Sequence, residues 1–296
     1  MAEPKSAALH LVDASPYIFR AYFSLPSSMR SPSGMQVNAV RGYADFLARL
    51  LREERPTHVL VAFDGSLTTS FRNDLYPAYK SSREKPDEEL LAQLEACYRV
   101  TEVLGLASSI DDRYEADDIV ATARARFERD FERFVVVTAD KDLAQLVDAR
   151  TCFYEFAKGM RLGPDEVLEK HGVRPEQVRD LLGLAGDSVD DIPGVRGVGP
   201  KTATALLEEF DDLDAIYAGL DRVAEMGFRG ARTLAPKLEE HRNIAFLSRE
   251  LATCSTEAPM PFDVAGLARR SIDGDAAASL AAELGLDSIA RAAREL

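Results

Sequence analysis

The residues best suited to chemistry in this sequence are carboxylates that lie far apart along the chain but at similar places in its pattern. They are Asp13, Asp64, Glu115, Asp117, Asp118, Asp140 and Asp142. Four of them follow apolar runs, and the other three precede a helical run. One acid suits a helix N-terminus. Three acids within residues 115–118 repel one another, so the surplus predicts a bound cation.

The chemistry that such a set could perform is hydrolysis assisted by two metal ions. Mg²⁺ and Mn²⁺ prefer oxygen ligands. A two-metal site holds its ions about 3.5–4 Å apart and needs acids from several chain segments. Asp187 and Asp190 complete a set of nine candidate ligands. Each acid alone could equally be a helix cap or a solvated loop residue, but that explanation is weak for the whole set.

The elements that must position these acids follow from hydrophobic periodicity. Apolar runs at 9–13, 58–64 and 134–138 predict strands, with weaker strands at 107–110 and 151–156. Helical patterns cover 37–55, 88–104 and 115–129. Strands that alternate with helices predict an α/β fold with a parallel sheet. Ligands bind at the carboxyl edge of such a sheet, where these acids lie.

After about residue 160 the sequence becomes helical, so we predict an α/β core at 1–160 and a helical region at 161–296. The pattern Gly-Val-Arg-Gly-Val-Gly-Pro-Lys-Thr-Ala at 194–203 predicts a helix–hairpin–helix at about 177–210. Glycines allow a close backbone approach, and a helix start binds anions. The residues we expect to hold DNA phosphates there are Arg196, Gly197, Gly199, Lys201 and Thr202. An ordinary glycine-rich turn is the alternative.

A polar segment after the second strand mixes bases with aromatics. We expect Arg72, Tyr79, Lys80 and Arg83 to contact DNA beside the metal ions. That mixture suits phosphate contact and base stacking. The segment alone fits a solvated loop with buried tyrosines equally well.

Composition limits the class of protein. The chain has 296 residues, a formal net charge of −14 and no apolar run long enough to span a membrane. Net acidity alone disfavours nucleic acid as a partner, unless the acids converge on metal ions. Three widely spaced cysteines and the absence of a signal-peptide pattern predict a cytoplasmic protein.

Taken in order, these motifs resemble the 5′-nuclease family, which includes flap endonucleases, phage 5′-exonucleases and the N-terminal domain of bacterial family A DNA polymerases. The resemblance covers about residues 9–262. The residues that carry it are Leu-Val-Asp13, Ala-Phe-Asp64, Phe-Arg72, Tyr79-Lys80-Ser-Ser-Arg83, Tyr-Glu115-Ala-Asp117-Asp118, Thr-Ala-Asp140-Lys-Asp142 and Leu-Ala-Gly-Asp187-Ser-Val-Asp190.

The resemblance implies a PIN-like core with a helical arch at about 70–100 and a monomer that cuts DNA near a 5′ end or 5′ flap. It implies two or three Mg²⁺ or Mn²⁺ ions. The first would be held by Asp64, Glu115, Asp117 and Asp118 near Asp13, and the second by Asp140, Asp142, Asp187 and Asp190. Lys80 and Arg83 would meet the scissile phosphate, and Tyr79 would stack on a base. Carbonyls of the hairpin, at Val195 and Val198, would bind K⁺.

Two features depart from the family pattern. Asp191 stands where Asn is usual, and the arch segment Arg83-Glu-Lys-Pro-Asp-Glu-Glu is unusually acidic. The rival hypotheses are a PIN-type ribonuclease or phosphohydrolase, which would not need the hairpin, and a non-cutting DNA-binding relative, which would have lost some of the acids.

Overall fold

The computed structural model describes residues 6–66, 68–227 and 230–296. Its centre is a six-stranded sheet in the order β3-β2-β1-β4-β5-β6. The strands are β1 (Ser6–Asp13), β2 (His58–Asp64), β3 (Ala107–Asp111), β4 (Phe131–Val137), β5 (Thr151–Glu155) and β6 (Met160–Leu162). The first five are parallel, as predicted, whereas β6 pairs antiparallel with β5. The expectation that strands end before residue 160 is therefore wrong by one short strand.

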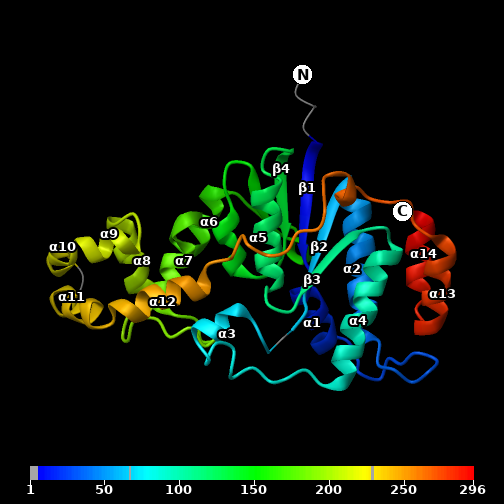
Figure 1. Ribbon diagram of the computed structural model, residues 1–296, viewed down its shortest axis with the longest axis horizontal. Helices are drawn as coiled ribbons and strands as arrows, with labels where there is room; N and C mark the ends of the chain where they lie inside the picture. The colour runs from blue at the N-terminus through cyan, green and yellow to red at the C-terminus, as the bar shows by residue number, and fades with distance from the viewer. Residues whose placement is uncertain (1–5, 67, 228–229) are drawn as a thin grey trace.

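Two layers of helices cover the sheet (Figure 1). One face packs against α1 (Ser15–Ser24), α2 (Asn38–Glu54) and α4 (Glu88–Val103), and the other against α5 (Ala116–Arg126). Alternation along β1 explains both layers, because Leu9 and Leu11 join the core on the α5 side while Val12 joins the core on the α2 side. The short helix α3 (Phe71–Leu75) precedes α4.

The helical region lies beside the sheet (Figure 1) and packs around a further core that also includes Phe153 of β5. Its helices are α6 (Pro164–His171), α7 (Val178–Ala185), α8 (Pro200–Glu209), α9 (Leu213–Ala218), α10 (Leu220–Glu225), α11 (Ala231–Glu240) and α12 (Arg242–Ala252). The helices α7 and α8 flank the glycine-rich turn. The helix–hairpin–helix predicted at 177–210 thus has helices on both sides of its turn.

The C-terminal residues return to the α/β core. Helices α13 (Gly274–Leu284) and α14 (Asp287–Glu295) pack on the α2 layer, to which they contribute Leu280 and Ile289. The segment before them packs on the α5 layer through Met260 and Leu267. The packing therefore differs from the predicted division at residue 160, because the end of the chain belongs with the first region.

Much of the expected arch is part of the core. Helix α4 buries Ala96, Cys97 and Val100 against the α2 layer, so within residues 71–100 only 76–87 lack regular structure. Three of the acidic residues that depart from the family pattern in the arch segment, Asp87, Glu88 and Glu89, lie at the start of α4. Asp87 caps α4 by accepting a hydrogen bond from the Leu90 N–H at 2.7 Å, and acidic residues suit the first turn that follows.

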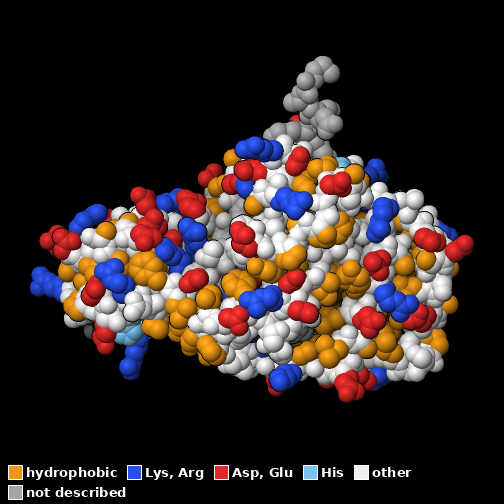
Figure 2. All heavy atoms as spheres, viewed as in Figure 1, with side chains coloured by type: hydrophobic (Ala, Val, Ile, Leu, Met, Phe, Trp, Pro, Cys, Tyr) orange, Lys and Arg blue, Asp and Glu red, His pale blue; other side chains and the backbone are white. Residues whose placement is uncertain are grey.

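The surface mixes charges of both signs, as Figure 2 shows for one face. Among the described residues, none of the helices combines the length and apolar character needed to cross a lipid bilayer.

Candidate active site

The carboxyl ends of the strands open into a hollow of about 180 Å³, here called the carboxylate hollow. Seven of the nine predicted ligands line it: Asp13, Asp64, Glu115, Asp117, Asp140, Asp142 and Asp190. Lys80, Arg83, Ser15 and Phe19 also line it. The parallel register brings the ends of β1 and β2 side by side, since Asp13 pairs with Ala62, two residues before Asp64. The topology therefore gathers acids from well-separated parts of the chain.

Hydroxyl groups orient the two strand-end carboxylates. Thr138 Oγ1 donates to Asp13 Oδ2 at 2.8 Å, and Ser15 Oγ donates to Asp64 Oδ2 at 2.5 Å. The backbone N–H of Ala116 donates to Asp64 Oδ1 at 2.8 Å. Sequence reasoning missed both hydroxyl residues. Ser15 stands two residues after Asp13, and Thr138 stands two before Asp140, and that spacing was the available signal.

The acids of the hollow repel one another. Burial, followed by the charges of Asp64 and Asp140, raises the pKa of Asp13 well above its usual value. Burial and the charge of Asp140 raise the pKa of Asp142 to about 7. One carboxylate oxygen of Asp142, Oδ1, is buried and has no hydrogen-bond partner among the described residues. A site with this excess of negative charge and free oxygen favours a cation.

Basic side chains are the cations now present. Lys80 Nζ lies 2.6 Å from Glu115 Oε2 and 3.7 Å from Asp190 Oδ2. Arg83 pairs with Asp190 as well. Burial opposes ionisation of Glu115, but the charges of Lys80 and Arg72 and the hydrogen bonds from Lys80 and Tyr79 together outweigh burial and lower the pKa of Glu115. Within the described part of the chain, no three acidic, histidine or cysteine side chains are grouped as a ready-made metal site. The all-oxygen donor set fits Mg²⁺ or Mn²⁺ in type, and the ligand groups are turned toward lysine and arginine.

Asp118 and Asp187 do not line the hollow. Asp118 is fully buried, and its two oxygens accept from the guanidinium of Arg72 at 2.7 and 2.8 Å. Asp187 pairs with Lys141 at 2.8 Å. The predicted role of Asp118 as a catalytic metal ligand therefore needs correction, because Arg72 already occupies both of its carboxylate oxygens.

Two residues predicted to contact DNA are buried instead. Arg72 is 1% exposed and also donates to the backbone carbonyls of Leu251 and Thr253, at 2.7 and 3.0 Å. Tyr79 is 3% exposed, and its hydroxyl donates to Glu115 at 3.1 Å. Burial leaves neither side chain a surface for DNA, so both predictions are wrong in this conformation. Arg72 ties α3 to α5, to the last turn of α12 and to the residue after it.

The 80–83 turn is joined to the loop that carries Asp190. The Lys80 N–H donates to the Asp190 carbonyl at 3.0 Å, and the Ser82 N–H donates to Asp191 Oδ2 at 2.8 Å. Lys80 itself has a left-handed backbone with φ of 53°. Asp191, which departs from the family pattern, thus has a structural role in holding the turn that presents Lys80 and Arg83.

The hairpin lies outside the carboxylate hollow. Gly194 has φ of +61°, and a Cβ there would meet the Gly186 nitrogen at 2.3 Å. Arg196, Gly197, Gly199 and Lys201 are exposed, and Thr202 is half-buried. The side chains of Val195 and Val198 are buried, and the Val198 N–H donates to the Val195 carbonyl at 2.9 Å. The turn therefore presents polar backbone and basic side chains while its valines anchor it.

Most of the chain matches models of one protein family. Residues 8–172 match the family model of the 5′-3′ exonuclease N-terminal resolvase-like domain, and residues 173–275 match the 5′-3′ exonuclease C-terminal SAM fold. The chain is 31% identical to a 5′-3′ exonuclease of Buchnera aphidicola, over 88% of this chain and 90% of that protein. It is 37% identical to DNA polymerase I of Bacillus subtilis, over 95% of this chain and 32% of the polymerase. The chain thus spans about a third of that polymerase.

Solved structures share the fold. The T5 5′-exonuclease with bound divalent zinc ions matches with a TM-score of 0.68 at 18% identity, covering 97% of each chain. The bacteriophage T5 D15 flap endonuclease in a complex with DNA and metal ions also matches with a TM-score of 0.68, at 19% identity, covering 97% of this chain and 98% of that one.

Proposed function

Since this chain belongs to the 5′-3′ exonuclease family, we propose that it hydrolyses phosphodiester bonds of DNA near 5′ ends and at 5′-flap junctions, in replication and repair. The observation that carries the proposal is the convergence of seven carboxylates, with Lys80 and Arg83, in one hollow. Hydrolysis of a phosphodiester needs charge neutralised on both sides of the reacting phosphate. The relatives solved with metal ions and with DNA support the same conclusion.

We assign two groups of acids to divalent metal ions, Mg²⁺ or Mn²⁺. Asp13, Asp64, Glu115 and Asp117 would hold the first, and Asp140, Asp142 and Asp190 the second or a third. When bound, such ions lower the pKa of a water nucleophile and stabilise the leaving oxygen. Asp118 and Asp187 would act behind these ligands, by fixing Arg72 and Lys141.

The basic residues have a separate role in this proposal. Lys80 and Arg83 neutralise Glu115 and Asp190 now, and they would turn to the scissile phosphate when substrate enters. Their charges would stabilise the negative charge that develops there. Tyr79 would keep the Glu115 carboxylate oriented through its hydroxyl.

The hairpin would hold the duplex by its backbone. Arg196, Gly197, Gly199, Lys201 and Thr202 surround the start of α8, where N–H groups and basic side chains favour phosphate without reading sequence. The carbonyls of the Val195–Val198 turn are the candidates for K⁺. We further propose that the protein works as a monomer in the cytoplasm, where its three free cysteines would stay reduced.

The test is cleavage of a labelled 5′-flap duplex with Mg²⁺, with and without EDTA, by wild-type protein and by Asp64→Asn. Asp111→Asn is the matched control, because Asp111 ends β3 at the same sheet edge but accepts from the N–H groups of Arg113 and Tyr114 instead of lining the hollow. We expect metal-dependent cutting that Asp64→Asn abolishes and Asp111→Asn retains. An equal rate for both variants would contradict the site, and faster cutting of a matched RNA would favour a ribonuclease.

A further inference from the structure

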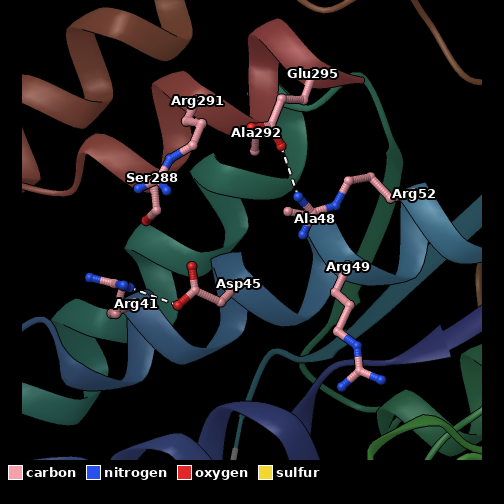
Figure 3. A pocket seen from close by; sticks show the side chains of 9 residues that line it. All are labelled: Arg41, Asp45, Ala48, Arg49, Arg52, Ser288, Arg291, Ala292 and Glu295. Atoms are coloured by element: carbon pink, nitrogen blue, oxygen red, sulfur yellow. Dashed lines mark hydrogen bonds and ion pairs between the residues drawn. The ribbon is translucent and has the colours of Figure 1, made fainter.

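A second hollow, of about 250 Å³, lies between α2 and α14 (Figure 3). We call it the α2–α14 groove. The side chains that matter in it are Arg41, Asp45 and Arg52 from α2, and Ser288, Arg291 and Glu295 from α14. None of them lines the carboxylate hollow.

The lining is basic although the chain is acidic. Four arginines and two carboxylates line the groove, in a chain with a formal net charge of −14. One of the four, Arg49, pairs with Glu53 and lies over the Phe156 ring at 5.0 Å. Figure 3 shows its guanidinium directed away from α14. Arg41, Arg52 and Arg291 are therefore the arginines that can serve a ligand in the groove.

Two of these arginines have partners that a stronger anion could replace. Arg41 pairs with Asp45 at 2.7 Å and Arg52 with Glu295 at 2.8 Å, and all four side chains are 40–50% exposed. Exposed ion pairs of this kind contribute little stability. A phosphate, like a carboxylate, can bind a guanidinium through two oxygens, and the phosphate of a mononucleotide also carries a larger charge than one carboxylate.

Two polar side chains of α14 that line the groove have no partner among the described residues. Arg291 forms no ion pair or hydrogen bond with any other residue in the described ranges. Ser288 Oγ is buried and also has no hydrogen-bond partner among the residues described. Buried polar atoms normally have partners. A donor hydroxyl and a free guanidinium three residues apart on one helix form an incomplete anion site.

A neighbouring hollow connects the groove to α1, and α1 also lines the carboxylate hollow. Asp45 and Arg49 also line a neighbouring hollow, together with Tyr17 and Arg20 of α1. Phe19, on the same helix, lines the carboxylate hollow. A strand of DNA that leaves the reacting centre over α1 would therefore reach the groove.

We propose that the α2–α14 groove binds a phosphate group, with Arg291 as its fixed contact, Ser288 as a donor whose hydroxyl turns toward the ligand, and Arg41 as an exchangeable contact. The inference rests on the proposed function, because a phosphate-bearing ligand is what a nuclease acting on DNA would meet. The phosphate belongs either to the DNA backbone or to a free mononucleotide such as the one an exonuclease releases.

The experiment compares Arg291→Gln with Arg294→Gln in metal-free buffer. Arg294 is the matched control, since it is an exposed arginine of the same helix that does not line the groove. Binding of a nicked flap duplex is measured by fluorescence anisotropy from about 50 to 200 mM salt, the range over which phosphate contacts change affinity strongly. Binding of deoxyadenosine 5′-monophosphate is measured by calorimetry. Ser288→Ala provides a second variant that leaves the charge unchanged.

If the DNA backbone is the ligand, Arg291→Gln lowers duplex affinity several-fold and reduces the salt slope by about 0.9, whereas Arg294→Gln does not. If a mononucleotide is the ligand, Arg291→Gln and Ser288→Ala weaken only the nucleotide. Equal behaviour of Arg291→Gln and Arg294→Gln in both assays would overturn the groove proposal. Failure of the proposed function is read separately, as absence of flap cleavage by the wild-type protein in Mg²⁺.

Discussion

Adjacent residues Asp117 and Asp118 should respond in opposite ways to the same substitution. Asp118→Asn removes the charge that faces Arg72 in a fully buried pair. Asp117→Asn removes a charge from the carboxylate hollow, where burial and the neighbouring Asp118 raise the pKa of Asp117 well above its usual value. We therefore expect Asp118→Asn to damage the fold and Asp117→Asn to damage cleavage.

The magnitude follows from the contacts of each carboxylate. Asp118 accepts two hydrogen bonds from Arg72 and one each from the N–H groups of Ser255 and Glu115, at 2.6 and 3.1 Å. Breaking a buried ion pair costs about 3–5 kcal/mol. Asn keeps part of the hydrogen bonding, so we expect about 3 kcal/mol, which lowers Tm by roughly 6–12 °C in a protein of this size.

For Asp117→Asn we expect no loss of stability. Its Oδ1 accepts from the Asp118 N–H at 2.7 Å, which an Asn carbonyl can also do. Removing its charge relieves repulsion, so the metal-free variant should melt at the wild-type temperature or above it. Cleavage in Mg²⁺ should fall at least about a hundredfold, because the proposed first metal ion, whose positive charge would stabilise the transition state, loses a carboxylate ligand.

The assays are thermal unfolding in EDTA and flap cleavage in Mg²⁺, on the same preparations. An Asp118→Asn protein that melts like the wild type but does not cut would refute our reasoning and restore Asp118 as a metal ligand. A loss of stability in Asp117→Asn equal to that in Asp118→Asn would refute the electrostatic account of the hollow.

Three further outcomes are expected. Lys201→Ala should weaken binding of duplex DNA and reduce its salt slope by about 0.9, and an unchanged slope in a salt titration would remove the hairpin from the DNA interface. Gly194→Ala should destabilise the protein by more than about 2 kcal/mol in urea unfolding, because its Cβ would meet the Gly186 nitrogen at 2.3 Å and its φ is +61°. Gly199→Ala has open space and should be tolerated, so equal losses would contradict the packing argument. In EDTA, stability should fall as pH rises from about 4 to 7, because the Asp142 pKa is raised to about 7 in the fold and the folded state holds a proton that the unfolded state has released. Mg²⁺ should reduce this dependence. A urea midpoint that stays constant across that pH range would show that the fold does not raise the pKa of Asp142.

The sequence alone determined that strands alternate with helices along the first part of the chain, and it determined the edge of the sheet where the acids meet. Apolar runs that end in Asp13 and Asp64 predict strand ends, and a parallel sheet brings such ends together. The motifs also predicted that the chain belongs to the 5′-nuclease family, and the family-model matches over residues 8–275 confirm this. These features depend on local periodicity and on topology, so they can be read without coordinates.

Only the tertiary structure decided which charged side chain faces which. Three acids within residues 115–118 look equivalent in sequence, but helix α5 turns Asp117 toward the hollow and Asp118 toward Arg72. Arg72 looks like a residue for DNA until the end of α12 and the residue after it supply two carbonyls as its partners. Asp191 looks like a spare acid until it accepts from Ser82, 109 residues away in the chain. Such roles depend on long-range packing, which places partners that no local pattern records.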